Sequence, residues 1–295
     1  MHGLLESVPN FSEGRDSAVL DAITDAFGAA GARVLDVHAD ADHNRSVFTV
    51  VADPDSLVEG LAAAIAVATG RIDLTTHEGV HPRVGAADVV PFVRFQEDDR
   101  RPELAARALA RRIAMLGVPA IGYGELGDGL RPAAFRAGGP ERLAERMSAG
   151  EIEALAGPDL PHPTAGAVLL GVRPPLVAFN VDLDTDDVAV ARAVAAQVRE
   201  RDGGLPGVQA LGLAARGGAQ VSTNLIDIDA TPLTEVVAEI ERRAREHGAG
   251  VRGCELVGLM PARVAARAAG SALRLEGFGA GSLLEVAAAG EFGDG

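Results

Sequence analysis

The 295-residue chain contains no lysine, so all 27 of its basic side chains are arginines. This absence excludes a Schiff-base lysine, the phosphate-binding lysine of a Walker loop, and every amine nucleophile except the N-terminus. Cys254 is the only cysteine. The chain therefore has no intrachain disulfide and no metal site built from several cysteines, and we expect a reducing, cytoplasmic compartment.

Long apolar runs and positive charge are also scarce. No stretch approaches the ~18 apolar residues of a membrane span, and the first residues do not resemble a signal peptide. The 42 acidic side chains outnumber the basic ones and give a formal net charge of −15. Nucleic acids and anionic membranes attract proteins of the opposite sign, so we expect neither as a partner.

What the sequence does contain is an ordinary globular composition, 47% hydrophobic and 23% charged, arranged in two similar halves. Hydrophobic periodicity predicts the order β-α-β-β-α-β twice, which is the ferredoxin-like order. We therefore predict an α/β fold of the α+β type with two ferredoxin-like subdomains. The predicted strands are 2–8, 34–37, 46–51 and 87–93, then 176–183, 208–213, 220–228 and 250–257, with helices at 16–29, from residue 53, at 186–199 and from residue 233.

Residues 96–175 connect the two halves. A helix at 101–116 and a short strand at 118–123 are followed by a stretch rich in glycine and proline, which predicts loops without a continuous core. Such loops, held by rigid elements, are suitable places for a ligand. Consecutive prolines at Pro174 and Pro175 cannot join a helix or a central strand, so we predict domains at 1–175 and 176–295.

The segment HEGVHPRVGAAD contains His77-Glu78-x-x-His81, which matches the pattern of zinc peptidases. That pattern binds zinc only on a helix, where residues four apart share one face. Pro82 disfavours the helical conformation at His81, and Gly79 lies between the two histidines. We interpret the match as accidental, and predict no metal.

Three polar loops contain the residues best suited to catalysis or ligand binding. An imidazole at His81 can accept a proton near pH 7, and the neighbouring Arg83 can hold a carboxylate. The loop HADADHNRS, from His38 to Ser46, concentrates acidic, amide and basic groups between two strands. The loop VPNFSEGRD can cap a helix or present backbone N–H groups to an anion. Each signal is weak alone.

Together these motifs resemble one family. The motifs occur along the chain in this order: VPNFSEGRD, DHNRSVFTVV, HEGVHPRVGAADVVPF, PHPTAGAV followed by LVAFNVDL, AQVSTNLIDID and ELVGLMP. The chain closely resembles the formiminotransferase domain of the glutamate formimidoyltransferase family, from Val8 to about Pro261. The resemblance implies that the two ferredoxin-like sheets face one another across a tunnel that holds the folate.

The resemblance also implies site residues. It assigns His81, in His81-Pro82-Arg83, as the catalytic base, and the segment from His162 to Gly166 as a folate-binding loop. Because the chain has no lysine, only arginines can bind the carboxylates of the anionic substrates. Arg45 and Arg83 are the main candidates, and Arg136 is a weaker one. The full set of predicted substrate- and folate-binding residues is Asn10, Ser12, His38, Asp40, Asn44, Arg45, Arg83, Gly85, Tyr123, His162, Thr164, Ala165, Gly166 and Asn224.

Three departures from the family pattern are visible. Mammalian members resemble D-V-D where this chain has Asp36-Val37-His38, so Asp40 or Asp42 is expected to supply the missing carboxylate. The loop 157–166 is several residues shorter than in the family. Nothing resembling the cyclodeaminase domain follows, so we expect that second activity to be absent.

The implied reaction transfers a formimino group from N-formimino-L-glutamate to N5 of tetrahydrofolate, a co-substrate, with no metal. The substrates are small molecules, and family analogy implies a homodimer. Three alternatives remain open at this stage: formyl transfer between 5-formyltetrahydrofolate and glutamate, a zinc metallopeptidase using His77 and His81, and an inactive folate-binding protein.

Overall fold

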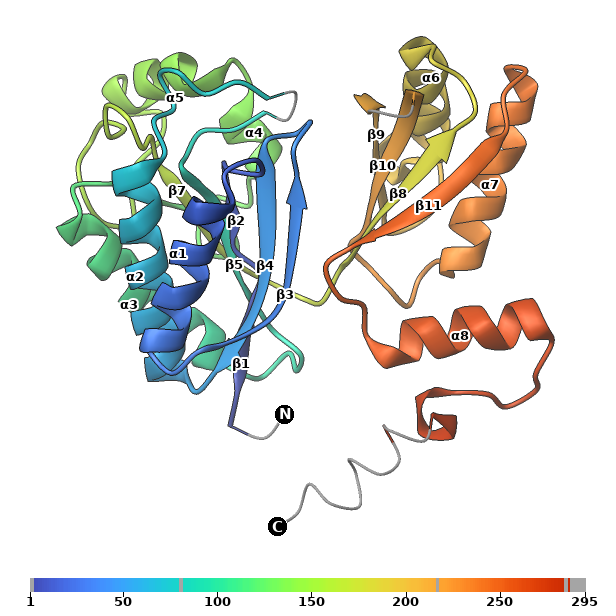
Figure 1. The fold of residues 1–295 in the computed structure, drawn as a ribbon, viewed down its shortest axis with the longest axis horizontal. Helices are drawn as coiled ribbons and strands as arrows, with labels where there is room; N and C mark the ends of the chain where they lie inside the picture. Colours follow the sequence, from blue (N-terminus) through green and yellow to red (C-terminus); the bar gives the residue numbers. More distant parts are fainter. Residues whose placement is uncertain (1–2, 80–81, 216–217, 284–285, 287–295) are drawn as a thin grey trace. The chain divides into compact units, whose positions relative to one another are not determined.

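A computed structural model describes residues 3–79, 82–215, 218–283 and 286 of the chain. Two compact units are present, Met1–Pro174 and Pro175–Gly295, and each contains its own sheet (Figure 1). Strand β7 (Val168–Arg173) belongs to the first sheet and β8 (Val177–Leu183) to the second. The predicted mixed α/β class is confirmed. No helix in the described part of the chain is long and apolar enough to cross a membrane.

The N-terminal unit begins with the predicted ferredoxin-like order. Its elements are β1 (Leu5–Ser7), β2 (Asn10–Phe11), α1 (Ser17–Ala29), β3 (Arg33–Asp40), β4 (Arg45–Ala52), α2 (Pro54–Arg71) and β5 (Ala87–Val93). Strand β4 pairs antiparallel with β3 on one side and with β1 and β2 on the other, and these two pair with β5. The strand predicted at 2–8 is present as the shorter β1, and β2 after Pro9, which has no N–H for the ladder, was not predicted.

Both helices of this part begin at an aspartate. The Asp16 side chain accepts a hydrogen bond from the N–H of Ala18, and Asp53 accepts from the N–H groups of Asp55 and Ser56. Each aspartate satisfies backbone donors that a helix leaves without partners at its start. The apolar face of each helix then packs on the sheet, where Phe11 and Phe48 lie edge to face at 5.4 Å.

The helix predicted at 101–116 and the strand predicted at 118–123 are present as α3 (Arg101–Met115) and β6 (Ala120–Gly124). The prediction that the glycine- and proline-rich stretch after them lacks a continuous core is wrong, because that stretch forms α4 (Pro132–Arg136), α5 (Gly139–Ser148) and β7. Strand β7 lies between β5 and β6 and is parallel to both, so the first sheet extends beyond the ferredoxin-like four-strand order. Helix α3 joins α1 and α2 over one face, and side chains of α4 and α5 pack with sheet residues in a second apolar cluster. The glycines and prolines mark turns between short elements rather than an unstructured segment.

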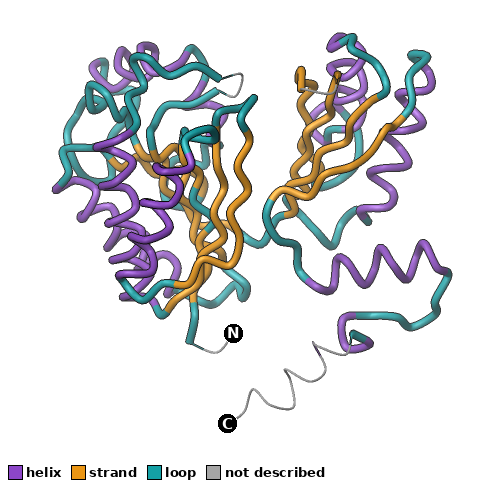
Figure 2. The backbone as a smooth tube through the Cα atoms, viewed as in Figure 1, coloured by secondary structure: helices purple, strands orange, loops and turns teal. Residues whose placement is uncertain are grey.

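The C-terminal unit follows the predicted order more closely. It consists of β8, α6 (Val188–Val198), β9 (Val208–Ala215), β10 (Gly218–Leu225), α7 (Leu233–Glu246) and β11 (Val251–Val257). The strand order β11-β8-β10-β9, all antiparallel, is that of a ferredoxin-like sheet. Helices α6 and α7 pack against it around a separate apolar core (Figure 2). Helix α8 (Ala262–Leu273), which packs on α7, was not expected.

Candidate functional site

Strand register gathers polar side chains on the face of the first sheet opposite α1, α2 and α3. Side chains directly across an antiparallel pair point to the same face. His38 pairs with Val47, and Asp40 pairs with Arg45, while Asn10 of β2 also pairs with Val47. On β4, Phe48 and Val50 alternate with these positions and lie on the helix side, in the apolar core. We call the opposite side the open face of the first sheet; it is polar near β3 and β4, and apolar where α4 and α5 pack near β6 and β7.

Three arginines and one aspartate form a charged cluster at this face. Arg136, from α4, pairs with the buried Asp88 of β5. Burial lowers the pKa of Arg45 to about 10, and the positive charges of Arg136 and Arg83 lower it further, while the negative charges of Asp88 and Asp40 oppose them. Burial likewise lowers the pKa of Arg83. The three arginines outnumber the carboxylates of Asp88 and Asp40 near them. The cluster is therefore suited to bind anions, although the whole chain has a net charge of −15.

Asn44 connects the turn between β3 and β4 to two other loops. Its side-chain oxygen accepts from the N–H of Gly14 at 3.0 Å, and its amide nitrogen donates to the carbonyl of Glu78 at 2.9 Å. Its backbone φ of 46° lies in the left-handed region, which asparagine tolerates better than most residues. Arg83 donates to the carbonyl of His43 at 2.9 Å and to that of Asn44 at 3.2 Å. The turn therefore positions the Arg83 guanidinium.

Asp40 organises the same turn through its carboxylate. One oxygen accepts from the N–H groups of Asp42 and His43, and the other lies 2.7 Å from Nδ1 of His43. The hydrogen bond from the His43 side chain is the largest of the interactions that hold the pKa of Asp40 well below its usual range. The sequence did not single out His43, although it is the acidic group's principal partner.

The predicted loop from His162 to Gly166 is a tight turn fastened to the sheet. The backbones of His162 and Gly166 hydrogen-bond to each other, and Nδ1 of His162 accepts from the N–H of Ala165 at 3.1 Å. Ala165 accepts from the N–H of Ala86, and Gly166 pairs with Gly85. A β-carbon on Gly166 would lie 2.0 Å from the carbonyl oxygen of Val84, so only glycine fits there.

His81, the predicted catalytic base, lies outside the described residues. Its neighbour in the zinc-peptidase pattern, His77, contacts the Arg83 guanidinium, and burial together with that positive charge lowers the pKa of His77. The zinc pattern requires a helix, and residues 77–79 are not helical. No group of three or more metal-binding side chains occurs within the described ranges.

Most of the predicted residues lie in the N-terminal unit, and several contact one another there. Asn10 accepts a hydrogen bond from Arg45, and Ser12 donates to the carbonyl of Gly85 at 2.8 Å. Tyr123 lies on β6, on the open face. His38 shares this face through its register, and Asn224 lies on β10 in the other unit. Asp88 was missed, although an aspartate within an otherwise apolar strand was a signal that could have found it.

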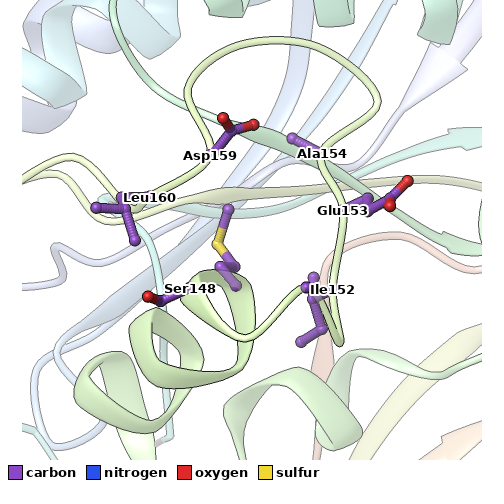
Figure 3. Close-up of a pocket in the computed structure, with 8 residues that line it drawn as sticks. Ser148, Ile152, Glu153, Ala154, Asp159 and Leu160 are labelled. Atoms are coloured by element: carbon purple, nitrogen blue, oxygen red, sulfur yellow. The ribbon is translucent and has the colours of Figure 1, made fainter.

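A hollow of about 510 Å³ lies elsewhere in the N-terminal unit (Figure 3). It is formed by the end of α5 and the loop that follows, and two acidic residues, Glu153 and Asp159, are among those that line it. None of the predicted site residues lines it. Its acidic lining is poorly suited to an anionic substrate.

The fold and the cluster together define an α/β protein with two sheets and a group of partly buried arginines beside the first sheet. Comparison with family models gives the finer assignment. Residues 4–173 match the N-terminal subdomain of the formiminotransferase domain, and residues 178–277 match the formiminotransferase domain model that follows it. The chain belongs to the formiminotransferase domain family.

Curated relatives agree over nearly the whole chain. A glutamate formimidoyltransferase of Streptococcus pyogenes serotype M1 is 37% identical, with 94% of this chain and 96% of the relative covered. One of Thermoplasma acidophilum is 36% identical, with 96% of each covered. The formimidoyltransferase-cyclodeaminase of Rattus norvegicus is 40% identical over 88% of this chain, which spans 51% of that relative. None of these comparisons favours the zinc-peptidase or the inactive alternative.

Proposed function

We propose that the protein is a glutamate formimidoyltransferase, which moves the formimino group of N-formimino-L-glutamate to N5 of tetrahydrofolate and releases glutamate. The observation that carries the proposal is the similarity to enzymes of that name along 94% and 96% of the chain. The arginine cluster supports it independently, because both substrates are anions with more than one carboxylate.

The reaction is an acyl-like transfer at an amidine carbon. N5 attacks this carbon, a tetrahedral intermediate forms, and the glutamate nitrogen leaves after it has been protonated. The attacking nitrogen must lose a proton and the leaving nitrogen must gain one. One histidine that titrates near neutrality can do both in turn, a contribution of typically ~10²–10⁴-fold. We propose His81 for this role, on the family resemblance of His81-Pro82-Arg83.

The roles of the remaining residues follow from the contacts around them. Arg45 and Arg83 bind substrate carboxylates, and Arg136 is held beside them by Asp88. Asn10, Ser12, Asn44 and Gly85 hold the loops of the site in place. Asp40 fixes the turn that presents Arg83, so a direct part in proton transfer is not needed. The loop of His162, Thr164, Ala165 and Gly166 binds the folate, and His38, Tyr123 and Asn224 complete the predicted binding set.

The proposal extends to the organisation of the protein. Residues 1–175 and 176–295 act as the N- and C-terminal formiminotransferase subdomains, with the folate in a tunnel between facing sheets. The chain works as a cytoplasmic homodimer with two small-molecule substrates and without nucleic acid, membrane or metal. Tetrahydrofolate takes part as a co-substrate.

The test is turnover of formiminoglutamate with tetrahydrofolate by purified protein, followed by identification of the folate product. We expect 5-formiminotetrahydrofolate and glutamate in equal amounts. If 5-formyltetrahydrofolate and glutamate react instead, the protein is a formyltransferase. If activity is lost on chelation together with stoichiometric zinc, or neither reaction occurs while folate still binds, the proposal is wrong.

A further inference from the structure

Arg173 is an arginine of the open face that the proposed function does not use. It is the last residue of β7, where its register partner is Val93 of β5, which in turn pairs with Glu6 of β1. Its side chain is half-buried, and burial lowers its pKa. Nη1 donates to the carbonyl of Pro174 at 3.0 Å. Within the described part of the chain, no carboxylate lies within ion-pair distance of this guanidinium.

Other partly buried arginines of the same unit are paired differently. Arg94 lies 2.6 Å from Glu125, Arg136 contacts Asp88, and Arg146 lies 3.4 Å from Glu151. A half-buried guanidinium loses hydration that a carboxylate normally replaces. Arg173 has lost part of this hydration and has only one backbone carbonyl in return. Its remaining N–H donors are available to an anion.

Tyr123 supplies a second donor at the same place. Its ring lies over Gly171, two residues before Arg173 on the same side of β7, and a β-carbon on Gly171 would lie 2.3 Å from Cζ. Burial raises the pKa of Tyr123 to about 12, so the phenol is a neutral O–H donor at physiological pH. Among the described residues, no group hydrogen-bonds to this O–H. The sheet thus carries a cation and a hydroxyl donor side by side.

Glu6 is the group that competes with an anion here. It lies in the same row across β1, β5 and β7, and burial raises its pKa while the positive charge of Arg173 lowers it. Glu6 shows no ion pair with Arg173, so it reduces the positive potential without occupying the guanidinium. Arg173 can therefore act either as the counter-charge of Glu6 or as a hydrogen-bond donor to a ligand, and variants must separate these two roles.

We propose that Arg173 and Tyr123 form a second carboxylate-binding subsite, which takes the glutamate tail of tetrahydrofolate. The proposal rests on the proposed function. Asp88, which holds Arg136, and Val93, the register partner of Arg173, are five residues apart on β5, or about 17 Å along a strand. Tyr123 is close enough to both arginines for their positive charges to lower its pKa against the effect of burial. Formiminoglutamate reacts next to its own carboxylates, which suits the Arg45 cluster. Tetrahydrofolate places its p-aminobenzoyl group between N5 and its carboxylates, which suits a distant subsite.

The test compares two substrates that differ only in the tail. For Arg173→Ala we expect KM for tetrahydrofolate to rise about 10- to 100-fold, the usual effect of losing a charge-assisted pair. KM for tetrahydropteroate, which lacks the glutamate, and KM for formiminoglutamate are expected to stay within threefold of the parent. Arg94→Ala, which removes a neighbouring but ion-paired arginine, is the control and leaves all three constants unchanged. Arg173→Gln repeats the measurement with a side chain of similar length if the alanine variant does not fold.

Three results would overturn the inference: an equal rise for both folates, a rise for formiminoglutamate alone, or no change. Tyr123→Phe, which keeps the ring over Gly171, is expected to raise KM for tetrahydrofolate a few-fold and not that for tetrahydropteroate. If Arg173 serves only to balance Glu6, the double variant Glu6→Gln/Arg173→Ala regains parental Tm and KM, which also overturns the inference. The parent protein's turnover tests the proposed function separately, because equilibrium binding of the two folates can be measured even in a protein without turnover.

Discussion

At the scale of single residues, the site depends on arginines held close to one another. Like charges at short range repel. A cluster of guanidiniums whose charge is only partly neutralised by carboxylates is therefore stabilised when an anion binds. Arg45 is the member most affected, because burial lowers its pKa and the positive charges of Arg136 and Arg83 lower it further. Asn10 orients its guanidinium through one hydrogen bond.

The first prediction concerns that anion. Arg45→Ala should raise KM for at least one substrate about 10- to 100-fold with a smaller effect on kcat, because it removes a charge-assisted pair. Steady-state kinetics with each substrate varied in turn provides the measurement. Arg107→Ala on the exposed surface of α3, where the arginine pairs only with Glu103, is the matched control. Unchanged constants for both substrates in Arg45→Ala would refute the assignment.

The second prediction separates the two histidines of the His77-x-x-x-His81 pattern. His81→Ala should lower kcat by about two or more orders of magnitude while folate still binds, because proton transfer is lost. His77→Ala should act mainly on KM, since His77 contacts Arg83 and does not transfer the proton. The pH–rate profiles of both variants decide between them. A near-parental kcat in His81→Ala, with a loss in His77→Ala, would mean that the wrong histidine was assigned.

The third prediction follows from the depressed pKa of Asp40. An ionised carboxylate that is stabilised in the folded state contributes stability above its unfolded pKa and loses it as pH falls. Asp40→Asn should therefore reduce the free energy of unfolding by about 1 kcal/mol near pH 6, with the difference shrinking below about pH 4. Urea unfolding from pH 6 to pH 3 measures it. Asp21→Asn on the exposed side of α1 should show no such trend, and a constant difference for Asp40→Asn would contradict the argument.

At the scale of elements, the loops of the site are fixed by backbone contacts rather than by their own length. The turn from His162 to Gly166 pairs with the segment before β5, and the turn after β3 is fixed by Asp40 and Asn44. Although shorter than expected for the family, the 157–166 loop is therefore anchored at its end.

The fourth prediction tests this anchoring. Gly166 has φ +69° and no space for a β-carbon, so Gly166→Ala should cost roughly 2 kcal/mol or more of stability and weaken folate binding. Gly28→Ala in α1 meets nothing within 4 Å and should instead stabilise by up to about 1 kcal/mol. Thermal unfolding and folate titration of both variants make the comparison. Tolerance of alanine at position 166 would show that the turn adapts.

At the scale of the whole molecule, the apolar cores of the two units are separate. The N-terminal clusters contain no residue of the C-terminal cluster, which is built on β8 and its neighbours. Each core is complete between a sheet and its own helices, so each unit has its own source of stability.

The fifth prediction follows from this separation. Leu183→Ala, at a fully buried position of β8, should destabilise its unit by about 2–5 kcal/mol and increase hydrogen exchange in residues 177–257. Protection of the strands β3 to β7 should change little. Leu109→Ala in α3, equally buried, should produce the reverse pattern. Equal loss of protection in both units after either substitution would show that they unfold together.

The periodic elements of both halves were predictable from sequence, because alternating and i, i+3, i+4 patterns depend on local burial. Strand β7 was not, since VLLGVR is a short apolar run surrounded by turn residues and its pairing partners are far along the chain. Helix α8 and the short strand β2 after Pro9 were missed for similar reasons. In each case, long-range pairing decided what local pattern left open.

The sequence by itself determined the family, the two ferredoxin-like orders and the restriction of positive charge to arginine, because motifs and composition are properties of the chain alone. Only the tertiary structure decided that Asp88 holds Arg136, that Asp40 pairs with His43, and that Arg173 is half-buried with a single backbone acceptor. The physical reason is that strand register and burial set which charges lie close together and how much water they keep. These quantities arise from contacts between residues distant in the sequence, and they determine where an anion can bind.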